Sequence, residues 1–466
     1  MNKSNHVHHC CSRREVMRSF AAGSIILPGM FAELLAADAS RPMDPLAPKP
    51  AHFPGKAKCV IFVFSNGGAS HMDTFDYKPE LFQADGKKTG IGGGLSNQQR
   101  VLLKPLWEFR PGGKCGTLVS DLFPHLRELM DDICLIRSLN GNDNEHYNAT
   151  LGMHTGSFFF SRPSIGSWVS YGLGTVNQNL PSFVALAPQM PYAGTQIFNN
   201  DFLPAYHQGV RVIGGADPIP NLTPRTPIRD LQQLELGLAD VLNNRHLNRH
   251  VEDSDLSARI RSFETAFHMQ ADAPEAFNVS AEDDRTLSLY GLKRGETEGF
   301  GWMCLVARRL AERGVRFIEL VDGSSSNNWD QHGNMAEHAI HARNIDQPLA
   351  GLLRDLKSRG MLEETLVVWT TEFGRTPGVD GDKGRGHHSA CFSSWLAGGG
   401  VKGGIAHGTT DELGATVATD GVHVHDFHAT ILHLLGIDHT KLTYRHAGRD
   451  YRLTDVHGRV VQELLA

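Results

Sequence analysis

The fold is decided by the stretch KCVIFVF at residues 58–64, which SNGG follows directly at residues 65–68. A short apolar run rich in β-branched and aromatic residues is typical of a strand that is buried on both faces. The polar residues and glycines after it predict that the strand ends there and opens into a loop. We therefore place the first strand of a buried sheet at residues 58–64.

Similar short strands recur along the chain, and segments with helical spacing lie among them. Strands are predicted at residues 131–137, 315–321, 366–370 and 391–396, and helices at 304–313, 337–359 and 427–435. Strands that alternate with helices predict an α/β fold with a mostly parallel central sheet and helices on both faces. Ligands of such sheets bind beyond the carboxyl ends of the strands.

The N-terminus has the pattern of an export signal. SRREVMR at residues 12–18 contains a twin-arginine pair, a moderately apolar stretch follows at 20–35, and AADA at 36–39 offers small residues for cleavage. The alternative is an amphipathic N-terminal helix with a chance arginine pair. The signal predicts transport of the folded protein by the twin-arginine machinery, often with a cofactor already bound, to the periplasm or outside the cell.

The domain organisation follows from these segments. We expect a signal peptide at residues 1–39, a Pro-rich linker at 40–57 and a single domain at 58–466. Within that domain, a helical and loop insertion is expected at about 180–300. No segment beyond the signal is apolar enough to form a stable membrane span.

Composition argues against two classes of protein. The formal net charge is -6 and no long run of Lys or Arg occurs, which argues against a nucleic-acid binder. The cysteines beyond the signal are widely and irregularly spaced, and the chain has no CxxC motif, so neither a zinc ribbon nor a redox pair is predicted.

Chemistry-bearing residues fall into four short clusters. They lie at residues 70–76, 329–332, 370–375 and 386–389. Three of these clusters follow a predicted strand and the fourth directly precedes one. Each cluster alone fits a surface loop or a structural ion pair as well as a site. Their shared placement beside the strands of one sheet favours a common site.

The residue types in three of the clusters predict a divalent-metal site. The proposed ligands are Asp330, His332, Glu372 and the adjacent pair His387 and His388. Zn²⁺ and Mn²⁺ accept such mixed oxygen and nitrogen ligands. Because adjacent histidines point in different directions, we expect only one of the pair to bind.

Four stretches together resemble the alkaline phosphatase and sulfatase superfamily. They lie at residues 67–76, 329–333, 371–377 and 426–437. Within the superfamily they are most similar to an uncharacterised, often exported branch, domain-of-unknown-function family 1501, and they span nearly the whole mature chain. The resemblance implies an alkaline phosphatase-like fold and hydrolysis of phosphate or sulfate esters. It also implies one or two divalent metals (Zn, Mn or Ca) and a small-molecule or polysaccharide ester as substrate.

The sequence departs from the superfamily pattern at the expected metal ligands. Asn66 stands where the first aspartate ligand ends the first strand, so Asp73 or His71 is expected to replace it. The later Asp-His pair corresponds to Glu372 and Phe373, which keeps a carboxylate and loses an imidazole.

The remaining ligands match more closely. The superfamily's last histidine ligand has a match in His388 or His387, and the spacing of Asp330 and His332 is shorter than in the superfamily.

The expected nucleophile departs most. Sulfatases place a Cys or Ser nine residues before a Thr-Gly pair, and counting back from residues 155–156 reaches His146. Three interpretations stay open: His146 accepts the phosphate, or it is a further metal ligand and water attacks directly, or it only caps or packs a helix. Thr150 is a more remote candidate nucleophile.

The residues and the resemblance together favour an exported, metal-dependent hydrolase of phosphate or sulfate esters. In this hypothesis Arg375 pairs with the anionic ester oxygens. The alternative is an exported binding or structural protein that keeps the fold without catalysis. Asp426, at the start of a predicted helix, is expected to cap that helix and not to act in catalysis.

Overall fold

A computed structural model describes residues 46–90, 100–215, 217–220, 222, 229–247, 249 and 254–466. The predicted signal at residues 1–39 and the start of the predicted linker lie outside the described residues. The chain separates into two compact units, residues 1–47 and 48–466, and every described helix and strand lies in the second unit.

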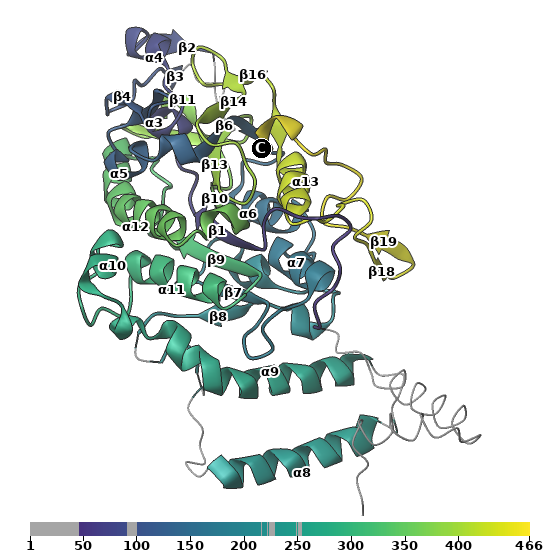
Figure 1. Cartoon of the computed structure of the whole chain (residues 1–466). Helices are drawn as coiled ribbons and strands as arrows, with labels where there is room; N and C mark the ends of the chain where they lie inside the picture. The colour runs from purple at the N-terminus through teal and green to yellow at the C-terminus, as the bar shows by residue number, and fades with distance from the viewer. Residues whose placement is uncertain are drawn as a thin grey trace, which may run out of the picture. The chain divides into compact units, whose positions relative to one another are not determined.

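A nine-stranded sheet runs through this unit in the order β14-β6-β13-β10-β1-β9-β7-β8, with β17 also paired to β6 (Figure 1). Its strands are β1 (Cys59–Ser65), β6 (Ile133–Asn140), β7 (Phe183–Leu186), β8 (Val210–Val212), β9 (Phe317–Asp322), β10 (Thr365–Thr370), β13 (Phe392–Ala397), β14 (Ile405–His407) and β17 (Val422–His423). All pairings are parallel except those of β13 with β10 and β6. The predicted mostly parallel sheet is confirmed.

Strand β1 lies in the interior of the sheet, between β10 and β9. Its alternating side chains enter two different cores: Ile61 and Val63 belong to one, and Phe62 and Phe64 to the other. Burial on both faces explains why its sequence is continuously apolar. Because β1, β9 and β10 run parallel, their carboxyl ends, and the loops that follow, meet at one edge of the sheet.

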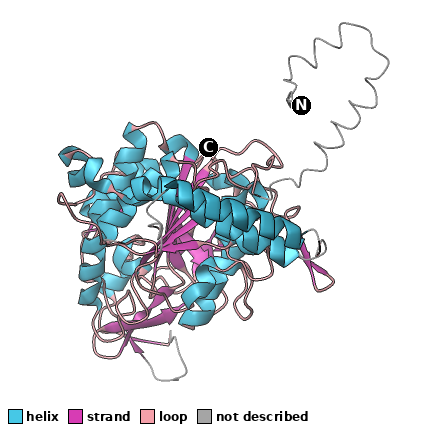
Figure 2. Ribbon diagram, turned by 90° about the horizontal axis from the view of Figure 1, so that it is seen from below, coloured by secondary structure: helices cyan, strands magenta, loops and turns pink. Residues whose placement is uncertain are grey.

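Helices cover both faces of the sheet, as predicted (Figures 1 and 2). One core receives side chains from α6 (His146–Thr155), α7 (Ile165–Leu173) and α13 (Val424–Leu434). The other receives them from α5 (Pro124–Arg127), α9 (Ser254–Phe277), α10 (Asp284–Leu289), α11 (Phe300–Glu312) and α12 (His338–Ser358). The remaining helices are α3 (His71–Thr74), α4 (Pro79–Gln83) and α8 (Arg229–Leu247).

Small two-stranded sheets lie outside the central sheet. They are β2 (Lys88–Thr89) with β3 (Arg100–Val101), β4 (Phe109–Gly112) with β5 (Thr117–Ser120), β11 (Gly374–Asp380) with β12 (Gly384–His388), β15 (Thr409–Thr410) with β16 (Val417–Thr419), and β18 (Tyr444–His446) with β19 (Arg449–Tyr451). The β11–β12 hairpin matters most, because it carries residues of the candidate site.

The segment at about 180–300, expected to be a helical and loop insertion, belongs in part to the central sheet. Its first portion supplies β7 and β8, which extend the central sheet in parallel beyond β9. Only four and three residues long, these strands carry too little apolar pattern to be recognised among prolines and glycines. The later portion forms the helices α8 and α9.

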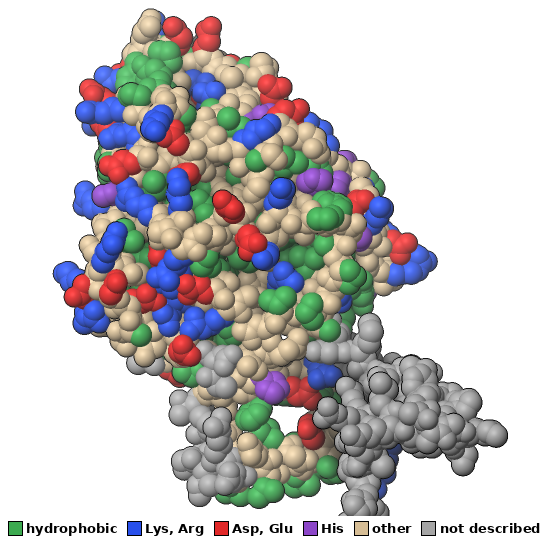
Figure 3. All heavy atoms as spheres, viewed as in Figure 1, with side chains coloured by type: hydrophobic (Ala, Val, Ile, Leu, Met, Phe, Trp, Pro, Cys, Tyr) green, Lys and Arg blue, Asp and Glu red, His purple; other side chains and the backbone are tan. Residues whose placement is uncertain are grey.

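On the face seen in Figure 3, basic and acidic side chains are interspersed. Within the described part of the chain, no helix is long and apolar enough to cross a membrane.

A candidate metal centre at the carboxyl ends of the strands

Three side chains from distant parts of the chain converge at this edge of the sheet. One ligand atom each from His146, Asp330 and His387 lies within 4.8 Å of the others. His146 is the first residue of α6, Asp330 lies in the loop after β9, and His387 lies on β12. The start of α6 is fixed by Glu145, whose side chain accepts a hydrogen bond from the Asn148 amide.

Asp330 is the centre of the group. Its Oδ1 lies 2.9 Å from Nε2 of His332, 3.3 Å from Nε2 of His387 and 2.6 Å from a guanidinium nitrogen of Arg375. Its Oδ2 lies 3.2 Å from Nε2 of His146. His332 therefore joins the three converging residues as a fourth candidate ligand.

In each of the three histidines, the ring nitrogen turned away from Asp330 is Nδ1, and it contacts a hydrogen-bond acceptor. Nδ1 of His146 lies 2.7 Å from Oε1 of Glu372, and Nδ1 of His332 lies 2.6 Å from Oδ2 of Asp380. Nδ1 of His387 lies 2.7 Å from the backbone carbonyl of Asn144. All three partners are acceptors, so each Nδ1 carries a proton. Each Nε2 is turned toward Asp330, where it donates to the carboxylate when protonated and offers a lone pair to a cation when neutral.

The facing Nε2 atoms fit a bound cation. Those of His332 and His387 are only 2.8 Å apart, and two lone pairs at this distance repel unless a cation or an added proton lies between them. Nε2 of His146 is buried without a hydrogen bond, although Asp330 Oδ2 is close, because the two atoms are not aligned as donor and acceptor. Side-by-side donor atoms of this kind are typical of ligands that share one ion.

The charged side chains around the histidines also favour a bound cation. The carboxylates of Asp330, Glu372 and Asp380 all contact imidazoles of this group, and the Arg375 guanidinium pairs with Asp330, so the group gathers an excess of acidic side chains when the histidines are neutral. A divalent cation among the histidines would neutralise this excess.

The pKa shifts show how strongly these groups act on one another. Burial alone would raise the pKa of Asp330, but its close contacts with the three histidines and the charge of Arg375 hold it well below its usual value. Burial lowers the pKa of His146, but its contacts with Asp330 and Glu372 outweigh burial and raise it. The hydrogen bond to Asp330 raises the pKa of His332, whereas burial lowers that of His387.

Glu372 therefore lies behind His146 and not at the centre of the group. Its carboxylate also accepts the amide hydrogen of Gly67, at 2.8 Å, and the hydroxyl of Thr371, at 3.1 Å. Gly67 has a φ of 109°, and a β-carbon there would lie 2.6 Å from Asn328 and Trp329. The turn after β1 thus requires glycine, and through it Glu372 and the Asp330 loop are fixed together.

Two further side chains complete the walls of the site. Tyr192 stacks on the His146 ring, with centroids 4.0 Å apart and 14° between planes, and its hydroxyl lies 3.4 Å from Asp330 Oδ2. Phe373 lies against His146 and His387, at 4.8 and 4.7 Å between centroids. These rings hold the imidazoles in place.

The sequence did not reveal Tyr192 or Asp380 as site residues. Tyr192 lies in a Pro-rich stretch with no motif, and Asp380 reaches His332 only because the β11–β12 hairpin folds back on itself. No spacing in the sequence predicts either contact.

Three of the predicted metal ligands lie apart from the group. Nε2 of His71 bonds to the carbonyl of Gly414 at 2.9 Å. The Asp73 carboxylate is buried against Arg385, whose Nε lies 2.7 Å away. Nε2 of His388 bonds to the carbonyl of Ala415 at 2.6 Å.

The expectation that only one of the adjacent histidines binds agrees with this geometry. Successive side chains on β12 point to opposite sides, so His387 and His388 cannot share one site. Asn66 follows β1 near the group, but its amide donates to the carbonyl of Ser324 at 2.7 Å and so is not aimed at the group.

Arg375 and Thr150 are not placed to act on a substrate. The Arg375 guanidinium is fully buried and donates to the backbone carbonyls of Gly67, Gly68 and Arg385 as well as to Asp330. It therefore clamps the turn after β1. The Thr150 hydroxyl is buried one turn into α6, without a hydrogen-bond partner.

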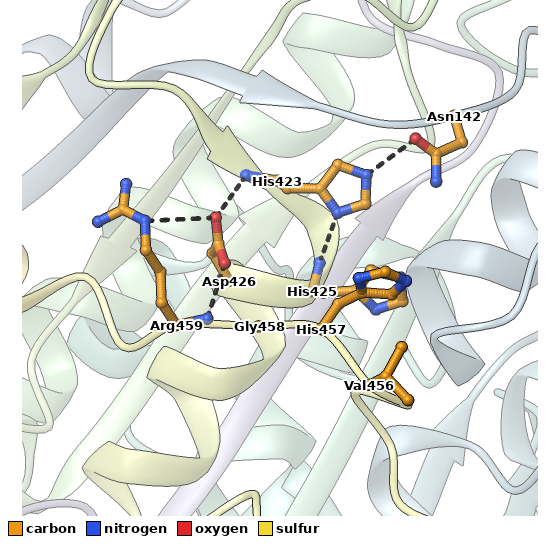
Figure 4. Close-up of a pocket in the computed structure, with 8 residues that line it drawn as sticks. All are labelled: Asn142, His423, His425, Asp426, Val456, His457, Gly458 and Arg459. Atoms are coloured by element: carbon orange, nitrogen blue, oxygen red, sulfur yellow. Dashed lines mark hydrogen bonds and ion pairs between the residues drawn. The ribbon is translucent and has the colours of Figure 1, made fainter.

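A second histidine cluster, at the start of α13, has a different character (Figure 4). A cavity of about 480 Å³ is lined there by His423, His425, His457 and Asp426, among others. Nδ1 of His423 accepts the amide hydrogen of His425, and its Nε2 donates to Asn142. Asp426 accepts the amide hydrogen of His423 and completes a capping box, as predicted. Both ring nitrogens of His423 are thus occupied by hydrogen bonds at the start of α13.

Comparison with solved structures finds similar chain paths at low identity. The lipoteichoic acid synthase LtaP from Listeria monocytogenes is 8% identical with a TM-score of 0.36, over 88% of this chain and 78% of its own. Alkaline phosphatase from the Antarctic bacterium TAB5 is 12% identical with a TM-score of 0.35, over 82% of this chain and 98% of its own. PsFucS1 sulfatase from Pseudoalteromonas sp. is 13% identical with a TM-score of 0.35, over 81% of this chain and 68% of its own.

A search of curated proteins finds no match. A family model described as "Protein of unknown function (DUF1501)" matches residues 57–465, nearly the whole of the second unit. The chain belongs to this DUF1501 family.

Proposed function

We propose that the protein is an exported metal-dependent hydrolase of phosphate or sulfate esters. The observation that carries the proposal is the common orientation of His146, His332 and His387. Each donates through Nδ1 to a fixed acceptor and turns Nε2 toward Asp330. Metal-binding histidines are typically oriented by such outer partners.

The residues that would hold the cation are His146, Asp330 and His387, with His332 as a fourth ligand. The mixture of imidazole and carboxylate suits Zn²⁺ or Mn²⁺ better than an all-oxygen ion such as Ca²⁺. A divalent cation bound there would polarise the ester oxygen and make a water molecule more acidic.

The surrounding residues prepare the site for this chemistry. Glu372 and Asp380 keep two histidines in the tautomer that binds metal, and the rings of Tyr192 and Phe373 limit the movement of His146. Arg375 holds Asp330 and the turn after β1 in register. The site is thus largely formed before any substrate arrives, which reduces the cost of binding.

The geometry favours direct attack by water over a covalent intermediate. Among the described residues, no Ser, Thr or Cys side chain forms a hydrogen bond with Asp330, His387 or His146. Of the three interpretations of His146, the role of metal ligand fits best, since its Nδ1 is occupied by Glu372 and its Nε2 faces the group.

Location and substrate are part of the proposal. The twin-arginine pattern at residues 12–18 supports export of the folded protein, through the twin-arginine machinery, to the periplasm or beyond. The substrate would be a small-molecule or polysaccharide ester.

The second candidate is a metal-binding protein without catalytic activity. The Arg375 guanidinium favours it, because all its nitrogens are occupied by acceptors of the protein and none is left to bind an anionic ester.

The test combines metal content and turnover. We expect stoichiometric Zn or Mn in the purified protein by elemental analysis, and hydrolysis of nitrophenyl phosphate or nitrophenyl sulfate that a chelator abolishes. His387→Gln should lose both metal and activity, whereas the matched control His457→Gln, at the exposed end of the second cluster, should lose neither. Bound metal without hydrolysis would refute the hydrolase and support the non-catalytic metal-binding protein. If the protein takes up no divalent metal, the proposed metal site is refuted.

A further inference from the structure

Helix α8 has one face turned to the rest of the protein and one turned away. Its half-buried positions are 232, 236, 243 and 247. Position 232 faces α9, because Nε2 of Gln232 donates to Oε1 of Gln270 at 2.9 Å. At ~100° per residue these positions fall within an arc of about 60°. This arc is the inner face of α8.

The opposite face carries a stripe of large apolar side chains exposed to solvent. The stripe consists of Leu231, Leu234, Leu238, Val241 and Leu242, whose exposed fractions are 45, 72, 62, 65 and 56%. These positions span about 100° of the helix and centre roughly opposite the inner face. Figure 3 shows hydrophobic side chains along the lower edge of the molecule, where Figure 1 places α8.

The regular spacing of the stripe distinguishes it from apolar side chains that are scattered singly over a surface. Spacings of three and four residues are those of a helix that packs along a partner helix. Burying one such side chain removes on the order of 100 Å² from water, so the stripe would contribute a few hundred Å² per chain. This is about half of what each partner buries in a standard interface, before polar neighbours are added.

We propose that the stripe is covered by a second copy of this chain, with the two α8 helices packed antiparallel. Leu231, Leu234, Leu238 and Val241 follow one another at intervals of three, four and three, which read the same in both directions. A two-fold axis near residue 236 therefore sets Leu231 of one copy against Val241 of the other, and Leu234 against Leu238. These four of the five stripe residues are complementary to themselves, as an isologous dimer requires, and Leu242 lies outside the symmetric set.

The charges on α8 favour this occupant over a lipid surface. Helices that lie on membranes carry Lys and Arg beside the apolar face. Here Glu235 and Asp240 lie along the same stretch of α8 as the stripe, and basic residues occur in the last turn, at Arg245 and His246. Antiparallel packing also sets the dipoles of the two helices head to tail.

The first experiment measures the mass of the purified full-length chain against concentration by sedimentation equilibrium. We expect a reversible dimer. Leu234→Glu with Leu238→Glu should raise the dimer dissociation constant by about a hundredfold or more, because it places charges in an apolar contact. The matched control, Gln233→Glu with Asn244→Glu, adds the same charge to exposed positions of α8 off the stripe and should leave the constant within about threefold. Circular dichroism would verify that both variants stay folded.

Disulfide trapping tests the direction of packing. Leu231→Cys combined with Val241→Cys should give a covalent dimer under mild oxidation, with the 231–241 link identified by mass spectrometry, whereas either change alone should not. In antiparallel packing two copies of residue 231 lie about 15 Å apart along the axis, too far for a disulfide. A monomer at 100 µM, links from the single variants, or stripe-dependent binding to anionic vesicles in place of dimerisation would each overturn the proposal.

Discussion

Nδ1 of His146 and Oε1 of Glu372 lie 2.7 Å apart, although the two residues are 226 positions apart in the chain. This contact joins the first residue of α6 to the segment that follows β10. It fixes which nitrogen of His146 faces Asp330, and so decides whether the side chain can bind a cation.

Glu372→Gln should weaken metal binding without abolishing it. The amide oxygen of glutamine can accept a hydrogen bond from His146, but it carries no charge and orients the ring less strictly. Loss of such an outer partner typically costs about 10- to 100-fold in affinity. Competition between the protein and a coloured chelator measures the change, and Glu363→Gln, at an exposed position just before β10, is the control. Equal affinities would exclude the orienting role of Glu372.

Asp380 and His332 should act as one unit. Since Asp380 positions His332 through Nδ1 at 2.6 Å, Asp380→Asn should lower metal affinity, and His332→Ala should lower it further. Once His332 is gone, removal of Asp380 should add little. Metal titration of the two single variants and the double variant gives the coupling. Fully additive losses would show that Asp380 acts by another route.

Gly67→Ala should disturb both stability and metal binding. The new β-carbon would lie 2.6 Å from the Asn328 side chain and the Trp329 amide, at a φ of 109° that side chains rarely adopt. We expect a loss of at least about 2 kcal/mol in the free energy of unfolding, from strain and displacement of the Asp330 loop. Gly86→Ala is the control, because Gly86 also has a positive φ but open space around it. Chemical denaturation and metal titration should separate the two, and similar results for both would show that strain alone matters.

Acid should destabilise the protein through buried histidines. Burial lowers the pKa of His71, His207 and His428 to about 3 each. The unfolded chain binds protons at these residues below about pH 6.5 and the folded chain does not, so stability is present above pH 6.5 and is lost as the pH falls toward 3. Between pH 7.5 and 5 each should cost about 2 kcal/mol.

His428→Gln isolates one of these contributions. Its Nε2 donates to the Met153 carbonyl at 2.6 Å, a bond that a glutamine amide can also make. The variant should lose about 2 kcal/mol less than the parent protein between pH 7.5 and 5, as measured by urea unfolding. The same pH dependence in both proteins would mean that His428 does not stay neutral.

The structure brings together only some of the predicted site residues, for reasons that particular residues show. Asp330, His332 and His387 lie together because they flank strands whose ends meet at one edge of the sheet. The choice between His387 and His388 needed the alternation of β12, which the predicted loop concealed. Tyr192 was missed because an irregular loop brings it in, and Asp380 because it reaches His332 only through the fold of the β11–β12 hairpin.

Local pattern in the sequence determined the buried strand at β1, the helices on both faces and the edge of the sheet where the polar clusters lie. These features depend on periodicity and burial, which neighbouring residues in the chain reveal. Only the tertiary structure decided which atoms meet. Contacts between segments far apart in the chain set the orientation of His146, His332 and His387, the burial of Arg375 and the pairing of Asp73 with Arg385. Such contacts are set by the packing of the whole domain, and no local spacing encodes them.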